Sequence, residues 1–196
     1  MLRRPTPGVL RNDLAQQAAL PFSYAAVGAT ANSPPADFKL DHARVRLGEG
    51  EQVYAAAVAA LQRWEQFQIG WFDAWPRDTP LTVGEVVAVL GRIGGLWWLN
   101  ACRIVYMVDE TGPICRFGFA YGTLPGHVER GEERFLVELD RSDGSVWYDT
   151  LAFSRPRHIL AHLGTPLVHR LQQRFREDSG SAMQRAVQSG PVNCVP

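Results

Sequence analysis

The stretch RFGFAYGTLPGHVERGEERFLVEL, from Arg116 to Leu139, contains two alternating segments that are joined by a short polar connection. Because successive side chains of a strand point to opposite faces, each segment gathers its apolar residues on one side. These residues are Phe117, Phe119 and Tyr121 in the first segment and Phe135, Val137 and Leu139 in the second. Pro125 and Gly126 lie between the segments and favour a turn. The stretch therefore predicts an antiparallel strand–turn–strand unit with one apolar face.

Segments of the same character occur on both sides of this unit. We expect strands at residues 38–47, 70–75, 85–90, 97–108, 115–121, 134–139 and 146–153. Their connections are short, as in DETGP (109–113) and RSDG (141–144), and we interpret Gly91, Gly94 and Gly95 as a turn between two strands. Strands with such short connections favour an antiparallel sheet over a parallel one.

Helical periodicity appears first in EQVYAAAVAALQRWEQF (51–67). There Val53, Ala57, Leu61 and Trp64 share one face, which predicts an amphipathic helix. Two shorter helices are expected, one from Asn12 or Asp13 through Ala19 and one over PRHILAHL (156–163).

The C-terminal part predicts a long helix that is capped by Thr165 and has Pro166 at its first position, where a missing N–H costs nothing. Its apolar stripe contains Leu167, Leu171 and Phe175. Such a stripe must be buried, and the apolar face of the sheet is the only large partner that the sequence offers.

The chain of 196 residues is long enough for one domain with a sizeable core. We expect a single α+β domain over residues 20–188, in which an antiparallel sheet wraps around the long C-terminal helix. Residues 1–19 are predicted to form an N-terminal extension, and residues 189–196 a flexible tail.

Charge and cysteine content argue against several classes of protein. The chain has 20 basic and 20 acidic residues and a formal net charge of +0, so no basic excess favours a nucleic-acid partner. Three scattered cysteines without a CxxC pair indicate a reducing compartment. The apolar segment 86–108 is long enough to span a membrane, but Arg92, Asn100 and Arg103 interrupt it. We therefore expect a cytoplasmic protein with no membrane span and no nucleic-acid partner, and the oligomeric state stays open.

Several longer motifs occur here in the order in which one family carries them. They are YAAVGAT (24–30), RLGEGEQVYAAAVAALQRWE (46–65), CRIVYMVDE (102–110), RFGFAYGTLPGHVERGEERFLVE (116–138), SVWYDTLAFSRP (145–156) and PLVHRLQQRF (166–175). Over about residues 20–187 the chain resembles DUF1990, an uncharacterised family of bacteria and plants with no assigned reaction.

This resemblance implies kinship with the START and birch-pollen-allergen-like helix-grip superfamily. That fold wraps an antiparallel sheet around a long C-terminal helix and often encloses a cavity. The chain departs from the family pattern at Ala25-Ala26, where the family has Pro-Glu, and after Trp64, where EQFQ replaces a more basic run. If either segment shapes a pocket mouth, ligand preference here differs, and fold membership alone assigns no function.

The connection between the two central segments holds the first candidate site. His127 and Glu129 are two residues apart, so on an extended strand they point the same way. A carboxylate beside an imidazole suits a general acid–base pair, because it fixes the tautomer and raises the basicity. Together with Glu132 and Glu133, the histidine also has the ligand types of a divalent metal site. The alternative is a polar turn whose charges are solvated or pair with neighbouring arginines.

A second set of residues has the chemistry of a small-molecule cavity. We predict ligand-binding roles for Trp98, Asn100, Tyr121, Tyr148 and Arg174. Aromatic rings with a few amides and hydroxyls line such cavities, although they are also typical of a packed core. An arginine on the C-terminal helix that reaches inward would bind a ligand carboxylate, and the alternative is a solvated ion pair with Asp178.

The pair His158 and His162 has the i, i+4 spacing of a helical zinc site but lacks the usual glutamate beside the first histidine. We predict no metal and no cofactor. Three functional hypotheses remain: a domain that binds a small apolar or amphipathic molecule, an enzyme of cyclase or hydrolase type that uses His127 and Glu129, and a structural or partner-binding protein.

Overall fold

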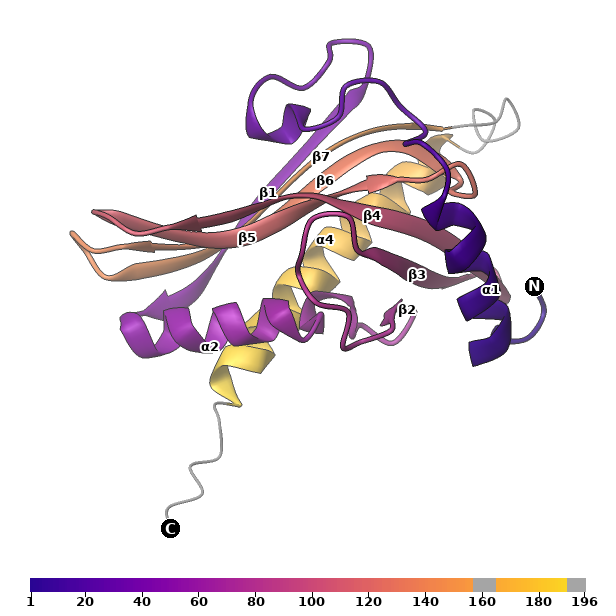
Figure 1. Ribbon diagram of the computed structural model, residues 1–196. Coiled ribbons are helices and arrows are strands. Elements are labelled where there is room, and N and C mark those ends of the chain that lie inside the picture. Colours follow the sequence, from indigo (N-terminus) through magenta and orange to yellow (C-terminus); the bar gives the residue numbers. More distant parts are fainter. Residues whose placement is uncertain (157–164, 190–196) are drawn as a thin grey trace.

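The computed structural model describes residues 1–156 and 165–189. Seven strands form one antiparallel sheet in the order β1-β7-β6-β5-β4-β3-β2 (Figure 1). The strands are β1 (Lys39–Glu49), β2 (Phe72–Trp75), β3 (Val86–Ile93), β4 (Leu96–Glu110), β5 (Ile114–Thr123), β6 (Glu129–Asp140) and β7 (Ser145–Pro156). The helices are α1 (Pro7–Ala18), α2 (Glu51–Gln62) and α4 (Thr165–Gln188), with short 3-10 helices η1 (Ala29–Ala31) and η2 (Glu65–Phe67). The expected α+β class with an antiparallel sheet is confirmed.

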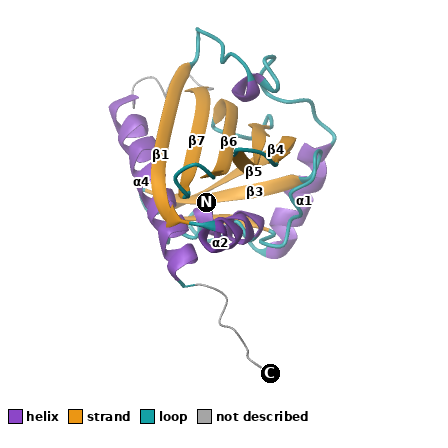
Figure 2. Cartoon of the chain, turned by 90° about the vertical axis from the view of Figure 1, so that its left-hand side faces the viewer, coloured by secondary structure: helices purple, strands orange, loops and turns teal. Residues whose placement is uncertain are grey.

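The sheet curves around α4, and α2 lies beside that helix on the same, inner face (Figure 2). The six alternating residues of the central strand pair all lie in or against the main core, as predicted. Ala57 and Leu61 of α2 are buried in the core, as predicted, but the helix ends at Gln62 and not at residue 67. Trp64 is also buried but lies beyond the helix, with a positive φ of 57°. Gly180 allows α4 to approach β1 closely, because a Cβ at this position would lie 2.9 Å from Cγ2 of Val45.

The N-terminal residues pack on the outer face of the sheet. Leu10 of α1 is only 2% exposed and packs against Ala88 and Leu90 of β3. The helix begins at Pro7, earlier than the predicted start at Asn12 or Asp13. The earlier start has a local cause, because the side chain of Thr6 accepts a hydrogen bond from the backbone N–H of Val9.

Two further predictions on the sheet need correction. Gly91 lies within β3, paired with Trp98 and Phe72, and the ring of Phe72 occupies the space where a side chain would stand. The turn consists of Gly94 and Gly95 alone, both with positive φ. The strand predicted at 134–139 begins earlier, at Glu129, so that the polar residues after the turn belong to β6.

The C-terminal helix starts at Thr165, as predicted, and its residues Phe175, Met183 and Val187 pack against the core. The predicted helix at 156–163, with His158 and His162, lies outside the described residues, as does most of the expected tail. Of the helices within the described ranges, none is long and apolar enough to cross a membrane.

Candidate functional site

A cavity of about 600 Å³ lies between the inner face of the sheet and α4. Most of its wall is apolar and comes from η2, from Trp71 and the adjoining β2, from β3 and from α4. These side chains are Phe67, Trp71, Phe72, Val89, Ile93, Leu171 and Phe175. Its volume is within the range of pockets that bind small molecules, about 300–1,000 Å³.

Small side chains in the centre of the sheet explain why the space is hollow. Strand register places Tyr121, Glu133, Ala152 and Asp41 in one row across β5, β6, β7 and β1. Ala152 therefore lies between two acidic residues and fills little of the space above it. The next row contains Gly131 and Ser154, which leave the same region open. Further along these strands the inner residues are large, including Phe135, Val137 and Tyr148, and the core is filled.

Glu133 and Tyr121 form the central polar contact of the cavity wall. The Tyr121 hydroxyl donates a hydrogen bond of 2.9 Å to Oε2 of Glu133. Burial raises the pKa of Glu133 from 4.5 to about 7, and although this bond opposes the rise, the nearby charge of Glu129 adds to it. Burial also holds the pKa of Tyr121 well above its usual value. Glu133 is thus a carboxyl group that gains and loses its proton near neutrality.

We expect Glu133→Gln to change the pH dependence of stability. A carboxyl whose folded pKa is raised stabilises the fold only while protonated, so its contribution is lost as pH rises from 4.5 to about 7. The glutamine variant lacks this loss, so its free energy of unfolding relative to wild type should rise over that window. The gain is at most about 3 kcal/mol, because each pKa unit corresponds to about 1.4 kcal/mol and the group is partly exposed to the cavity.

Urea unfolding of both proteins between pH 4 and pH 8 measures this difference. Contributions from other titrating groups, His127 included, largely cancel in the comparison of the two proteins. A difference that stays flat over the whole range would show that Glu133 has an ordinary pKa.

A network of hydrogen bonds and ion pairs joins the strand side of the cavity to α4. The amide nitrogen of Gln172 donates to Oε1 of Glu129 at 2.9 Å, and its oxygen accepts from Lys39 at 2.9 Å. Asp41 forms ion pairs with Lys39 at 2.9 Å and with Arg176 at 3.1 Å. Burial and the charge of Asp41 raise the pKa of Glu129, whereas the charge of Lys39 and the Gln172 bond lower it. Asp41 is therefore neutralised twice, and Glu129 is held only by a neutral amide among the described residues.

His127 lies in the turn between β5 and β6 and lines the cavity. Its Nδ1 accepts a hydrogen bond of 2.9 Å from the backbone N–H of Glu129, which leaves the ring proton on Nε2. Burial lowers the pKa of His127 to about 4, so the ring is neutral at pH 7. The Glu129 carboxylate bonds Gln172, so the structure brings the two residues together through the backbone and not as an imidazole–carboxylate pair.

Trp98 and Asn100 lie on β4 and also line the cavity. Trp98 is 41% exposed, which places it where the cavity meets solvent. Asn100 is only 5% exposed, and its Oδ1 accepts a hydrogen bond of 3.3 Å from the backbone N–H of Val128. Within the described part of the chain, no hydrogen bond from the Asn100 amide nitrogen is found.

Tyr148 and Arg174 lie outside the cavity lining. The Tyr148 hydroxyl is buried against the Ser179 hydroxyl at 2.9 Å, within the filled part of the core. The Arg174 guanidinium pairs with Asp178 at 3.2 Å and stacks on the outer side of Trp71, with its central carbon 4.6 Å from the ring centroid. Neither residue faces the cavity.

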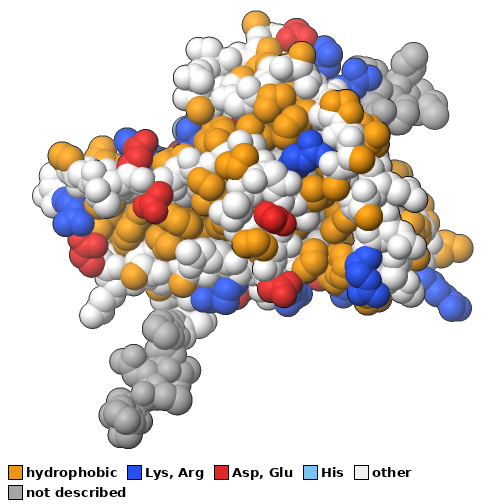
Figure 3. All heavy atoms as spheres, viewed as in Figure 1, with side chains coloured by type: hydrophobic (Ala, Val, Ile, Leu, Met, Phe, Trp, Pro, Cys, Tyr) orange, Lys and Arg blue, Asp and Glu red, His pale blue; other side chains and the backbone are white. Residues whose placement is uncertain are grey.

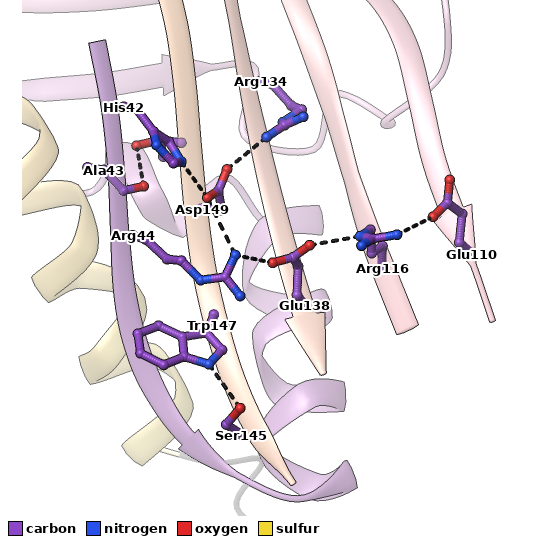
Figure 4. A network of polar contacts seen from close by, with 11 residues as sticks. His42, Ala43, Arg44, Glu110, Arg116, Arg134, Glu138, Ser145, Trp147 and Asp149 are labelled. Atoms are coloured by element: carbon purple, nitrogen blue, oxygen red, sulfur yellow. Dashed lines mark hydrogen bonds and ion pairs between the residues drawn. The ribbon is translucent and has the colours of Figure 1, made fainter. Parts of the chain in front are cut away.

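The outer face carries a separate polar cluster, which Figure 4 shows. Its members are Glu110, Arg116, Glu138, Arg44, Asp149, Arg134 and His42, and each is paired with another member. The Asp149 carboxylate contacts both His42, at 2.7 Å, and Arg134, at 2.9 Å. Because its charges neutralise one another, we assign this cluster to the stability of the sheet.

The cavity residues that sequence reasoning missed include Asp41, Ala152, Gln172 and Arg176. The two helical residues have i, i+4 spacing, which predicts one face, but only the phase of α4 against the sheet shows that this face is inward. In residues 1–156 and 165–189, no group of three or more His, Cys, Asp and Glu side chains is placed to hold a metal ion.

A curved antiparallel sheet that grips a C-terminal helix, with a cavity between them, defines the helix-grip class of α+β proteins. The solved structures agree: the crystal structure of human STARD10 has a TM-score of 0.51 at 10% identity, with 96% of this chain and 82% of that chain covered. At this level of identity the similarity shows the fold alone.

The chain belongs to the family described as "Domain of unknown function (DUF1990)", whose model matches residues 23–182. It is 41% identical to a UPF0548 protein of Dictyostelium discoideum over an aligned length of 162, and the match covers 78% of this chain and 74% of that protein. It is 39% identical to a UPF0548 protein of Deinococcus radiodurans over an aligned length of 198, and the match covers 95% of this chain and 98% of that protein. The resemblance inferred from the motifs is therefore confirmed, and the family extends to an amoeba.

Proposed function

We propose that this protein binds a small apolar or amphipathic molecule in the cavity between the sheet and α4. The apolar part of the ligand would lie against the aromatic wall formed by Phe67, Trp71, Phe72 and Phe175. Its polar part would lie against the wall that contains Glu133. Burial of apolar ligand surface supplies the affinity, and the few polar groups set the orientation.

The observation that carries this proposal is the cavity itself, with an unused hydrogen-bond donor on its wall. An amide nitrogen that faces a cavity and has no protein partner is free to donate to a bound molecule. Asn100 is 5% exposed, and among the described residues its amide nitrogen has no partner. A ligand acceptor would satisfy it. A cavity of about 600 Å³ also argues against the third hypothesis, which expected a filled core.

Titration with decan-1-ol tests the proposal, with the fluorescence of Trp71 and Trp98 as the signal because both rings line the cavity. We expect saturable binding of one molecule per chain and a higher melting temperature in its presence. A linear, unsaturable response without any thermal shift would contradict the proposal. Native mass spectrometry of the same samples gives the stoichiometry.

The second candidate is an enzyme of cyclase or hydrolase type, and one observation favours it. Glu133 has a pKa of about 7 inside the cavity, which suits a general acid or base, and neutral His127 on the same wall would donate from Nε2. In this form of the hypothesis Glu133 takes the place of Glu129. Turnover of a bound molecule that Glu133→Gln abolishes, with binding intact, would support it.

We also propose a cytoplasmic protein that does not bind nucleic acid. Basic and acidic side chains are interspersed over the face shown in Figure 3, so no positive patch for phosphates stands out there. The formal net charge of +0 points the same way.

A further inference from the structure

We propose that the ligand carries a protonated amine, held by the carboxylates of Glu133 and Glu129, on an apolar body. This inference rests on the proposed function, because it names the chemical class of the molecule that the cavity binds.

The two carboxylates have hydrogen-bonding capacity that the described residues do not use. Glu133 uses Oε2 to accept from Tyr121, and Glu129 uses Oε1 to accept from Gln172. Within residues 1–156 and 165–189, the second oxygen of each group accepts no hydrogen bond. Both residues line the cavity, so these oxygens offer acceptors to a bound molecule. An ammonium group has three donors and no acceptor, which complements such a wall.

The acidic residues on the cavity wall outnumber the cations beside them. Four acidic residues line the cavity, but the Glu132 carboxylate is bonded to the segment before β1, which leaves Asp41, Glu129 and Glu133. The two cations beside them, Lys39 and Arg176, both pair with Asp41. In the described structure neither glutamate has a cation within ion-pair distance. A buried carboxylate without a partner is costly, and a ligand cation would remove that cost. A ligand carboxylate would instead meet two unpaired acids and an arginine that is already engaged.

The apolar wall of the cavity is mainly aromatic. Aromatic rings from Phe67, Trp71, Phe72, Tyr121 and Phe175 surround the cavity. Such rings pack against an alkyl or aryl body, and their faces attract a cation that lies above them. An amine on an apolar body therefore matches both kinds of wall at once.

The site makes a specific prediction about pH. The pKa of Glu133 is about 7, and the groups that face it are Tyr121, Glu129, Asp41 and Arg176. An ammonium group beside Glu133 favours its ionised form, so binding releases a proton below that pH. The affinity for an alkyl amine should rise with pH, by at most about tenfold per unit, and level off above about pH 7. An alkyl amine keeps its proton throughout, as lysine does with a pKa of about 10.4.

The test compares three probes of one chain length at pH 8, namely decylamine, decan-1-ol and decanoate, on the full chain. We expect decylamine to bind at least tenfold more tightly than decan-1-ol, and decanoate to bind most weakly. Glu133→Gln should weaken decylamine by at least tenfold and change decan-1-ol by less than threefold. Glu49→Gln, the same change at an exposed position far along β1, should change neither.

Each other outcome overturns a defined part of the account. Equal affinity for decylamine and decan-1-ol overturns the amine proposal and leaves the cavity's ligand-binding role standing. Tightest binding of decanoate overturns it in favour of an acid bound through Arg176. If none of the three probes binds, the amine proposal and the proposed function fail together. The wild-type comparison decides the matter even if Glu133→Gln fails to fold.

Discussion

Replacing Glu132 with glutamine is expected to lower the free energy of unfolding by about 3–5 kcal/mol, the cost of disrupting a buried charged group. Its carboxylate is 2% exposed and accepts four hydrogen bonds from the segment before β1. The donors are the Tyr24 hydroxyl at 2.7 Å, the Gly28 N–H at 2.7 Å, the Thr30 N–H at 2.9 Å and the Thr30 hydroxyl at 2.5 Å. Glutamine replaces one acceptor oxygen with an NH₂ group, which is itself a donor. The donors that faced this oxygen therefore lose their acceptor.

Glu133→Gln is the matched control, because the two glutamates are neighbours that point to opposite faces of β6. At pH 8 this second variant should be as stable as wild type or more stable, since it removes the cost of an ionised carboxyl whose pKa is about 7. Urea unfolding of the three proteins gives the comparison. One ordinary hydrogen bond contributes about 1 kcal/mol. If the free energy of unfolding of Glu132→Gln lies within that amount of the wild-type value, the four hydrogen bonds to Glu132 do not stabilise the fold as described.

Filling the cavity is expected to have the largest effect on binding. Ala152→Leu puts three additional carbons into the space between Glu133 and Asp41, where Ala152 is the small member of the row. We expect the affinity for decan-1-ol to fall at least tenfold, about 1.4 kcal/mol. Because the leucine enters an existing cavity, stability should fall by less than the about 1–3 kcal/mol typical of an overpacked core.

Ala36→Leu makes the same chemical change at an exposed loop residue and should leave binding unchanged. Tryptophan fluorescence titrations of the three proteins measure the effect, with melting temperatures as a check on folding. Undiminished binding by a folded Ala152→Leu protein would place the ligand elsewhere on the molecule.

The architecture was predictable because the spacing of apolar residues along the chain distinguishes strands from helices and shows which face of each is buried. Alternation over residues 116–139 places Phe119 and Phe135 on one face, and the structure has both in the core. The start of α1 was predicted too late, because a single side-chain cap at Thr6 outweighs the weak apolar pattern of the helix.

The cavity was harder to predict because it depends on register between strands distant in sequence. Asp41 and Glu133 belong to one wall only because β7 lies between their strands, which no local pattern shows. The sequence also does not show which face of α4 is turned toward the sheet. Arg174 was expected to face the cavity, but Arg176 lines it instead. Burial also decides chemistry, since it favours the neutral form of both groups, raising the pKa of Glu133 and lowering that of His127.

Nuclear magnetic resonance of ¹⁵N-labelled protein during titration with decan-1-ol tests the central claim most directly, because it locates the ligand. The account predicts that the shifted amide signals belong to the inner wall, with Tyr121, Glu133, Ala152 and Gln172 among the most affected. Signals of the outer-face cluster around Asp149 and Glu138 should move little. Shifts confined to the outer face, or no saturable shifts at all, would contradict a ligand-binding cavity between the sheet and α4.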